Sequence, residues 1–204
     1  MAFGTKQQKN DFFRLSLTLF AITALVAAVL ALANYFTAPI IERAAKERLN
    51  TSLSKLISEA DSFEEMPAFP KEITAGGVSV PVDAVYEAKD SAGTFLGFCV
   101  HVAPSGYSDV IDMIVAIDQA GAVRDVEILS ISDTPGIGLK VKNDQEFQKS
   151  VLGLSEVAAI VKNPPASKTQ VQVIAGATIS SSAYISGVNA AIDVASQLMG
   201  EVVS

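Results

Sequence analysis

Cysteine, histidine and tryptophan are almost missing from this chain of 204 residues, which has one Cys, one His and no Trp. The single thiol, Cys99, excludes a disulfide within the chain and a cluster of thiolate metal ligands. The single imidazole, His101, leaves too few ligands for most zinc sites, and no Ser-His-Asp set can be assembled around it. We therefore expect Cys99 to be a small packed side chain and His101 to be a satisfied residue of a strand.

Positive charge is also scarce. The chain has 15 Lys and Arg against 22 Asp and Glu, a formal net charge of −7, and no basic residue follows Lys168. Nucleic-acid binding needs a basic face, so we expect no nucleic-acid partner. General adhesion to anionic lipid is excluded by the same charge.

Charge of either sign is absent from residues 15–36, which read LSLTLFAITALVAAVLALANYF. At about 1.5 Å per residue this run reaches roughly 30 Å, the thickness of a bilayer core. It predicts one transmembrane helix in contact with membrane lipid, behind a cytoplasmic head of residues 1–14. A buried helix of a soluble protein is one alternative. The other is a signal peptide cleaved after residues 31–33, although the apolar run exceeds a signal core of about 7–15 residues.

The remainder of the chain predicts an α+β fold, in which a single domain with an antiparallel sheet flanked by helices follows the membrane helix. Residues 37–78 are expected to form a linker, with a helix over 44–60 and a loop over 63–77, and residues 79–204 the domain. Alternating apolar residues predict strands over 82–88, 94–103, 111–117 and 123–130, joined by short turns that imply antiparallel pairing. In the second of these, Leu96 and Phe98 are expected to share a face, with Cys99 on the other.

Helical spacing returns in the last third of the chain. A short helix is expected at 143–153, capped by Asn143 or Asp144. Two prolines force a loop over 161–168, and a short strand is expected at 171–174. The final helix is expected from about Ser180 to Met199, with an apolar stripe that packs along its length.

The first motif of interest joins that strand to that helix. It reads Ala175-Gly176-Ala177-Thr178, followed by Ile179-Ser180-Ser181-Ser182. A Gly turn that opens a helix exposes unpaired backbone N–H groups, which together with the helix dipole suit a phosphate. The plain alternative is that Thr178 or Ser180 only caps the helix. A Walker lysine is absent, so a nucleoside-triphosphate P-loop fits poorly.

Two further motifs lie in loops. In the first, Thr134-Pro135-Gly136-Ile137-Gly138, the Pro-Gly pair favours a type II turn, and Gly138 adds bare backbone that a flat ring could approach. In the second, Pro104-Ser105-Gly106-Tyr107-Ser108, Tyr107 could stack or hydrogen-bond. Taken alone, each is equally compatible with an ordinary loop.

The three motifs in this order, behind one membrane helix, resemble the FMN-binding domain of the G subunit of the Rnf electron-transport complex. They also resemble its relative, the C subunit of the Na⁺-translocating NADH:quinone reductase, but the length favours the Rnf protein. The resemblance covers most of the chain. It implies that FMN is joined by a phosphoester bond to Thr178 through the action of a separate flavin transferase. The chain departs from the usual transferase motif at Gln172, six residues before the Thr, and at Ala175, three before.

The resemblance also implies the residues of the FMN site. We expect Gly176, Ala177, Ser180 and Ser181 around the phosphoryl group, and Thr134, Pro135, Gly136, Gly138 and Tyr107 near the ring. Since no basic residue follows Lys168, we expect backbone N–H groups and the Ser180–Ser182 hydroxyls to hold the phosphodiester without an Arg clamp.

The implied function is electron relay within a membrane complex that moves electrons between ferredoxin and NAD and translocates ions. The chain would act beside the other subunits of that complex, with its flavin domain outside the cytoplasmic membrane, and would complete no turnover alone. Two alternatives stay open at this point. One is a membrane-anchored binding or assembly protein without a cofactor, and the other is a secreted flavoprotein released by signal cleavage.

Overall fold

The structure is a computed structural model that describes residues 6–75, 77–132 and 138–202. The chain forms two units, Met1–Glu47 and Arg48–Ser204, and each is described by itself. Helix α1 (Lys6–Leu56) supplies the whole described part of the first unit and the beginning of the second.

The first unit is a helix with its apolar side chains exposed. Leu15 and Phe20, for example, are 71% and 69% exposed. The helix is long and apolar enough to cross a membrane by length and composition, with a mean hydropathy of 2.5 in its most apolar window. The hydroxyls of Thr18 and Thr23 donate to the carbonyls of Arg14 and Leu19, four residues earlier, at 2.8 and 3.0 Å. These bonds satisfy polar groups that would otherwise be costly in hydrocarbon.

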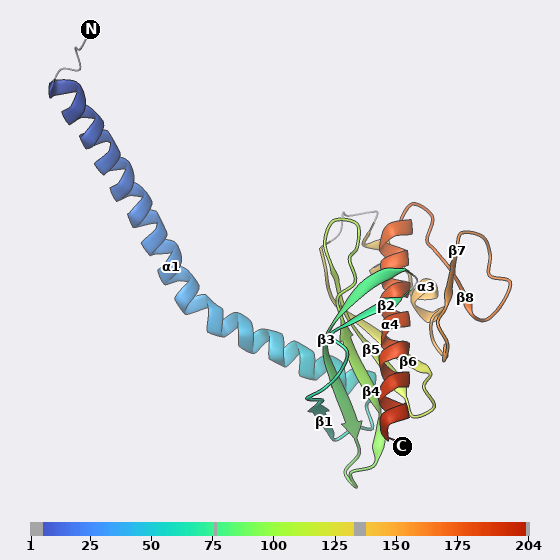
Figure 1. Cartoon of the computed structure of the whole chain (residues 1–204). Helices are drawn as coiled ribbons and strands as arrows, with labels where there is room; N and C mark the ends of the chain where they lie inside the picture. Colours follow the sequence, from blue (N-terminus) through green and yellow to red (C-terminus); the bar gives the residue numbers. More distant parts are fainter. Residues whose placement is uncertain (1–5, 76, 133–137, 203–204) are drawn as a thin grey trace. The chain divides into compact units, whose positions relative to one another are not determined.

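The second unit is built on an antiparallel sheet, which confirms the predicted α+β class (Figure 1). Its main strands are β3 (Val78–Lys89), β4 (Phe95–Val102), β5 (Ile111–Asp118) and β6 (Val123–Ile131), and each pairs with the next. Short β1 (Ser62–Glu65) and β2 (Glu72–Ala75) both pair with β3. The loop predicted over 63–77 therefore contains two strands. Their pairing uses backbone bonds to the long β3, which side-chain periodicity does not reveal.

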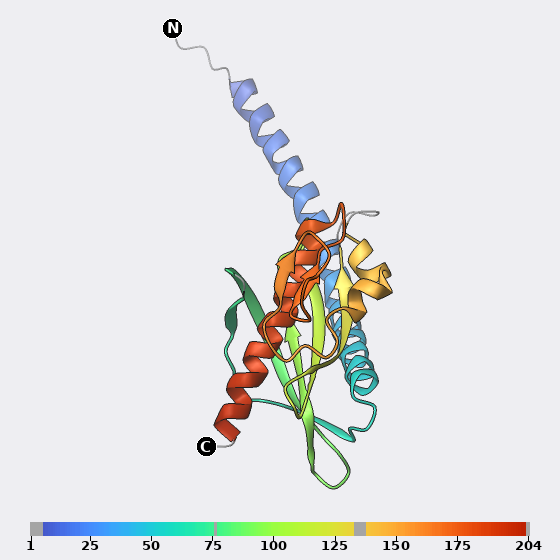
Figure 2. The same ribbon diagram turned by 90° about the vertical axis from the view of Figure 1, so that its right-hand side faces the viewer.

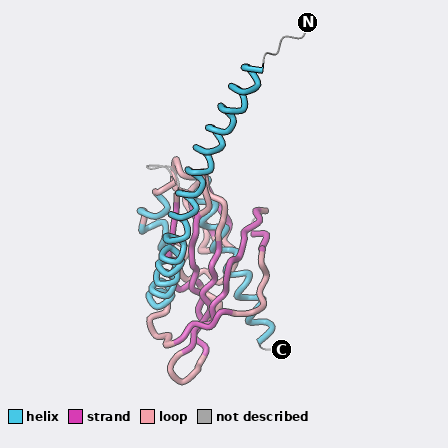
Figure 3. The backbone as a smooth tube through the Cα atoms, turned by 90° about the vertical axis from the view of Figure 1, so that its left-hand side faces the viewer, coloured by secondary structure: helices cyan, strands magenta, loops and turns pink. Residues whose placement is uncertain are grey.

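The smaller elements complete the fold. Helices α2 (Lys140–Asn143) and α3 (Gln145–Lys149) follow β6, and Asp144 caps α3 by accepting from Phe147 N, as predicted. A parallel pair of short strands, β7 (Ala159–Val161) and β8 (Gln170–Gln172), precedes the long helix α4 (Thr178–Val202). Figure 3 shows the strands lying among these helical segments.

Both faces of the sheet are covered by helix (Figure 2). On one face α4 buries the predicted stripe, in which Ile185 and Val188 are fully buried, against Val100, Met113 and other residues of the sheet. On the other face the last turns of α1 bury Leu53 and Leu56, each worth roughly 1.5–3 kcal/mol of apolar burial. The helix predicted over 44–60 is therefore confirmed as the end of α1, with its apolar face on the sheet.

One strand departs from the predicted alternation. Ala88 pairs with Gly97 and Lys89 with Phe95, so Leu96 is an extra residue in β4. Gly97 has φ +150°, and a Cβ there would lie 2.1 Å from the Ile117 carbonyl oxygen. The bulge places Leu96 on the same face as Cys99, and the prediction that it shares a face with Phe98 is wrong.

Candidate functional site

The connection from β8 to α4 is a tight turn that presents Thr178 at the surface. Gly176 has φ +79°, a conformation that residues with a Cβ rarely adopt, and Ala177 N donates to the Ile174 carbonyl at 3.0 Å. Ala177 is 2% exposed, which anchors the turn in the core, while Thr178 is exposed as the first residue of α4. The hydroxyl of Thr178 therefore stands on a fixed backbone at the mouth of the helix.

Thr178 and Ser180 lie after the cap position of this helix. Because α4 begins at Thr178, both Thr178 and Ser180 lie inside the helix, and the capping position falls on Ala177, whose carbonyl accepts from Ser181 N at 2.9 Å. Ala has no side-chain oxygen with which to cap. The first N–H groups of a helix have no intrahelical acceptor, and their dipoles favour an anion.

Ser181 holds the turn from within. Its side chain is fully buried, and its hydroxyl donates to the Ala177 carbonyl at 2.8 Å and accepts from Ile174 N at 3.1 Å. Ser180 is 1% exposed as well. The two hydroxyls that we expected around the phosphoryl group thus lie below the surface at which Thr178 is exposed, and that of Ser181 joins the end of β8 to the first turn of α4.

A basic side chain reaches this turn from an element distant in sequence. Lys140, in α2, donates from Nζ to the Ala175 carbonyl at 3.1 Å, and a Cβ on Gly176 would lie 3.5 Å from the same nitrogen. The expectation that the phosphodiester is held without an Arg clamp did not consider this lysine. The composition of the segment after Lys168 could not reveal a contact that spans 35 residues.

The fold brings the loop that carries Tyr107, the end of β6 and the start of α4 to one end of the sheet. Ile111 of β5 pairs with Ile131 of β6, so the loop before β5 and the segment after β6 leave the sheet at the same end. The first carries Tyr107, and the second leads through Gly138 to Lys140, which contacts the turn before Thr178. Figure 1 shows the start of α4 at this end.

The structure describes only some of the other residues that were predicted to lie in the site. Gly138 is buried and its carbonyl accepts from Val141 N at 3.2 Å, while Tyr107 is 57% exposed. Thr134, Pro135 and Gly136 lie outside the described residues. A shallow surface hollow adjoins Lys140; its lining comprises Lys140, Asn143, Asp144, Gln145, Glu146 and Ile174.

His101 and Cys99 take no part in this arrangement. His101 Nε2 lies 2.5 Å from Asp112 Oδ1, so the imidazole is partnered, as predicted. Asp83 lies near the pair, and the ligand atoms of the three residues are within 4.8 Å of one another on adjacent strands. Cys99 is fully buried, and this burial raises the pKa of its thiol to about 12, so it is an inert packed residue.

Comparison with known proteins gives a consistent picture. The family model of the FMN-binding domain matches residues 106–193. The G subunit of the Na⁺-translocating ferredoxin:NAD⁺ oxidoreductase complex of Acetobacterium woodii is 34% identical, over 89% of this chain and 90% of the relative. The G subunit of the proton-translocating ferredoxin:NAD⁺ oxidoreductase complex of Clostridium ljungdahlii is 24% identical, over 92% and 93%. The crystal structure of Shewanella oneidensis NqrC aligns over 65% of each chain with 18% identity and a TM-score of 0.44.

Proposed function

Because the chain belongs to the G-subunit family of the Rnf-type ion-translocating oxidoreductases, we propose that it is a membrane-bound electron-relay protein that carries FMN on Thr178. The observation that carries this proposal is that Thr178 is exposed as the first residue of α4, directly after the turn at Gly176. The helix N-terminus and the Lys140 ammonium beside the turn offer donors and positive charge to one phosphodiester. Phosphate chemistry therefore fits the groups that the chain places there.

Attachment to a threonine hydroxyl requires an activated flavin nucleotide. A flavin dinucleotide supplies the leaving group: the Thr178 Oγ–P bond forms, the P–O bond to the nucleoside monophosphate breaks, and the hydroxyl proton passes to a base. A Thr hydroxyl is a weak nucleophile without such a base, so a flavin transferase supplies the catalysis. Thr178 is exposed and therefore accessible to that partner, and Gln172, six residues earlier, is exposed as well.

The protein then positions the bound flavin and excludes alternative geometries. Bound FMN supplies the capacity to accept and donate one or two electrons. Thr178 fixes one end, while Gly176, Ala177, Ser180 and Ser181 shape the turn beneath it. We assign Tyr107 and Gly138 to the ring side, because the loop before β5 and the end of β6 lie at the same end of the sheet. Thr134, Pro135 and Gly136, which lie outside the described residues, are assigned to the ring side by the family resemblance.

The setting of the site is the membrane surface. In this proposal the apolar part of α1 anchors the chain in lipid, and the family resemblance puts the flavin domain on the extracytoplasmic side of the cytoplasmic membrane. The relatives are named as subunits of ferredoxin:NAD⁺ oxidoreductase complexes, some Na⁺-translocating and some proton-translocating. By that likeness the donor and acceptor of electrons are other subunits of such a complex, and the chain by itself completes no turnover.

The test is the mass of the peptide that contains Thr178, from protein made together with the transferase. The parent should gain one FMN less one water and give a fluorescent band after denaturation. A Thr178→Ser variant, which keeps the hydroxyl, should retain a fluorescent band, and Thr178→Ala should lose it entirely. An unmodified, colourless parent would instead support the alternative of a membrane-anchored assembly protein without a cofactor.

A further inference from the structure

Lys140 is the one cationic group that the described residues place on the turn before Thr178. It lies at the start of α2, two residues after Gly138, and the sequence motifs do not include it. We propose that Lys140 is a positioning residue of the FMN site: its ammonium pairs with the phosphodiester on Thr178 and ties the α2 side of the site to the α4 side. This inference rests on the proposed function.

The first step is proximity. Lys140 Nζ lies 3.1 Å from the Ala175 carbonyl oxygen and 3.5 Å from where a Cβ of Gly176 would stand. Thr178 follows Gly176 by two residues, which limits the distance between their Cα atoms to about 7.6 Å. The ammonium therefore lies on the turn that directly precedes the residue to which we assign the phosphoryl group.

The second step is donor capacity. An ammonium group has three N–H donors, and the bond to the Ala175 carbonyl occupies one of them. That bond directs the remaining donors from a fixed position, because Ala175 belongs to a turn closed by the bond from Ala177 N to the Ile174 carbonyl and by the Ser181 hydroxyl. The lysine is thus held by its own turn contact before any phosphate arrives.

The third step is charge. The chain offers no Lys or Arg after Lys168, so positive charge for the phosphodiester has to come from an earlier part of the sequence. A phosphodiester carries one negative charge, which one ammonium balances. Lys140 is exposed, so water screens the pair and the effect is modest, about threefold in rate or equilibrium.

Lys140 also connects two segments of the proposed site. It lies two residues after Gly138, which we assign to the ring side, and its side chain ends on the turn that we assign to the phosphate side. The hydrogen bond from Lys140 to Ala175 therefore joins two halves of the site that are 35 residues apart in sequence. A change at Lys140 should alter how the flavin is received and leave the chemistry of the ring unchanged.

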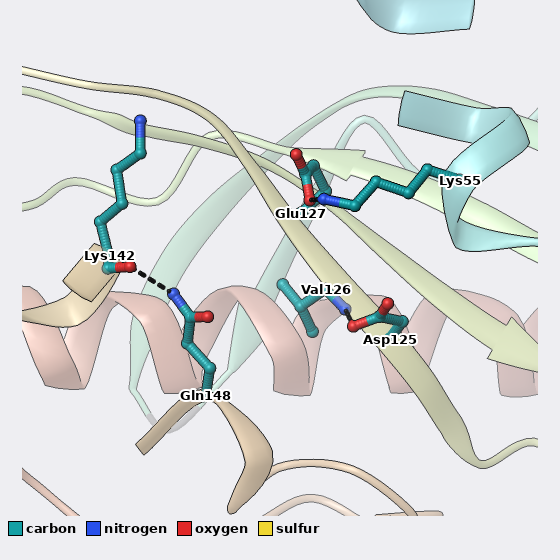
Figure 4. A network of polar contacts seen from close by, with 6 residues as sticks. All are labelled: Lys55, Asp125, Val126, Glu127, Lys142 and Gln148. Carbon is teal, nitrogen blue, oxygen red and sulfur yellow. Dashed lines mark hydrogen bonds and ion pairs between the residues drawn. The ribbon is translucent and has the colours of Figure 1, made fainter. Parts of the chain in front are cut away.

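The experiment follows flavin attachment to the full chain, prepared without its transferase in detergent and then mixed with the transferase and a flavin dinucleotide. Lys140→Gln removes the charge and keeps an N–H donor, whereas Lys140→Arg keeps both. Lys142→Gln is the matched control, because it removes the same charge from the same short helix. In Figure 4 the Lys142 carbonyl accepts from Gln148 Nε2 at 3.0 Å, and its ammonium points away from that contact.

We expect Lys140→Gln to slow attachment about threefold at low ionic strength, Lys140→Arg to restore most of the rate, and Lys142→Gln to match the parent. The difference between the parent and Lys140→Gln should shrink in roughly 0.5 M salt, which a purely structural tie would not predict. The midpoint potential of the attached flavin should be the same in all four proteins, because the phosphate is remote from the ring.

Three results would overturn the inference: parent-like attachment in Lys140→Gln, an equal loss in Lys142→Gln, or failure of Lys140→Arg to restore the rate. A shifted potential with an unchanged attachment rate would also overturn it, since the cation would then act on the ring. None of these affects the proposed function, provided that the parent is labelled and Thr178→Ala is not. A parent that takes no flavin would remove both.

Discussion

Replacing Ser181 by Ala tests whether the turn before Thr178 is held by the buried hydroxyl. The Ser181 side chain is 0% exposed and bridges two backbone groups, donating to the Ala177 carbonyl and accepting from Ile174 N. Alanine fits the same space but makes neither bond. The perturbation thus removes the link between the end of β8 and the first turn of α4 while the apolar packing stays as it is.

The expected cost follows from these two bonds. A net intramolecular hydrogen bond contributes about 1 kcal/mol, so the loss of both costs about 2 kcal/mol. The better helix propensity of Ala returns about 0.5 kcal/mol, which leaves about 1.5 kcal/mol of destabilisation. For a chain of this size each kcal/mol lowers the melting temperature by about 2–4 °C, so the shift should be roughly 3–6 °C.

The assay is thermal unfolding of the full chain in detergent, followed by near-ultraviolet circular dichroism. Ser182→Ala is the matched control, because it makes the same change in helix propensity one residue later, at a half-buried position. Ser182→Ala should leave the melting temperature within about 1 °C of the parent. If Ser181→Ala and Ser182→Ala have the same melting temperature, the Ser181 hydroxyl does not hold the turn, and the proposed geometry of the turn before Thr178 is wrong.

Three further predictions concern the core. Burial raises the pKa of the Cys99 thiol to about 12, so Cys99 should resist a maleimide at pH 8 in the native protein and react in urea. An unfolded thiol ionises near pH 8.5, so the free energy of unfolding should fall progressively above about that pH. Rapid native labelling would contradict the burial. Tyr184→Phe should be neutral or stabilising by up to about 1 kcal/mol in chemical denaturation, because the buried Tyr184 hydroxyl has no partner among the described residues. A clear loss of stability would show that the hydroxyl has a hydrogen-bond partner. Gly187→Ala should destabilise the protein by about 1–3 kcal/mol, since the new Cβ would lie 3.0 Å from Pro104 Cγ. Gly200→Ala, with no atom within 4 Å of its new Cβ, should stabilise it by a few tenths of a kcal/mol. Equal effects of the two variants would refute the close packing at Gly187.

Local sequence patterns predicted most of the helices and strands and the buried face of most of them. Alternation in β5 and the helical stripe of α4 predicted their buried faces correctly, because side-chain direction repeats every two residues in a strand and about every 3.6 in a helix. The charge-free run of residues 15–36 predicted a helix long enough to span a membrane, because the length of an apolar helix follows from its number of residues. The motif at Gly176 predicted a turn that opens a helix, and the helix runs beyond the expected bounds at both ends, from Thr178 to Val202.

Tertiary structure decided what lies beside each motif. The contact of Lys140 with Ala175 and the pairing of β1 with β3 join residues more than 20 positions apart, and the partner of His101 comes from the neighbouring strand. The composition of the paired segments does not reveal such contacts. Side-chain periodicity also could not show that the bulge at Leu96 reverses the face of that residue, because the extra residue is defined only by its pairing with β3.

The two levels meet at Thr178. Local chemistry explains why a helix begins there and why its first N–H groups favour an anion. The exposure of that hydroxyl, the burial of Ser180 and Ser181 beneath it, and the arrival of a lysine from α2 depend on how the sheet and α4 pack together. Short-range preferences act within a few residues along the chain, whereas a binding site is made by groups that only packing brings within a few ångströms of one another.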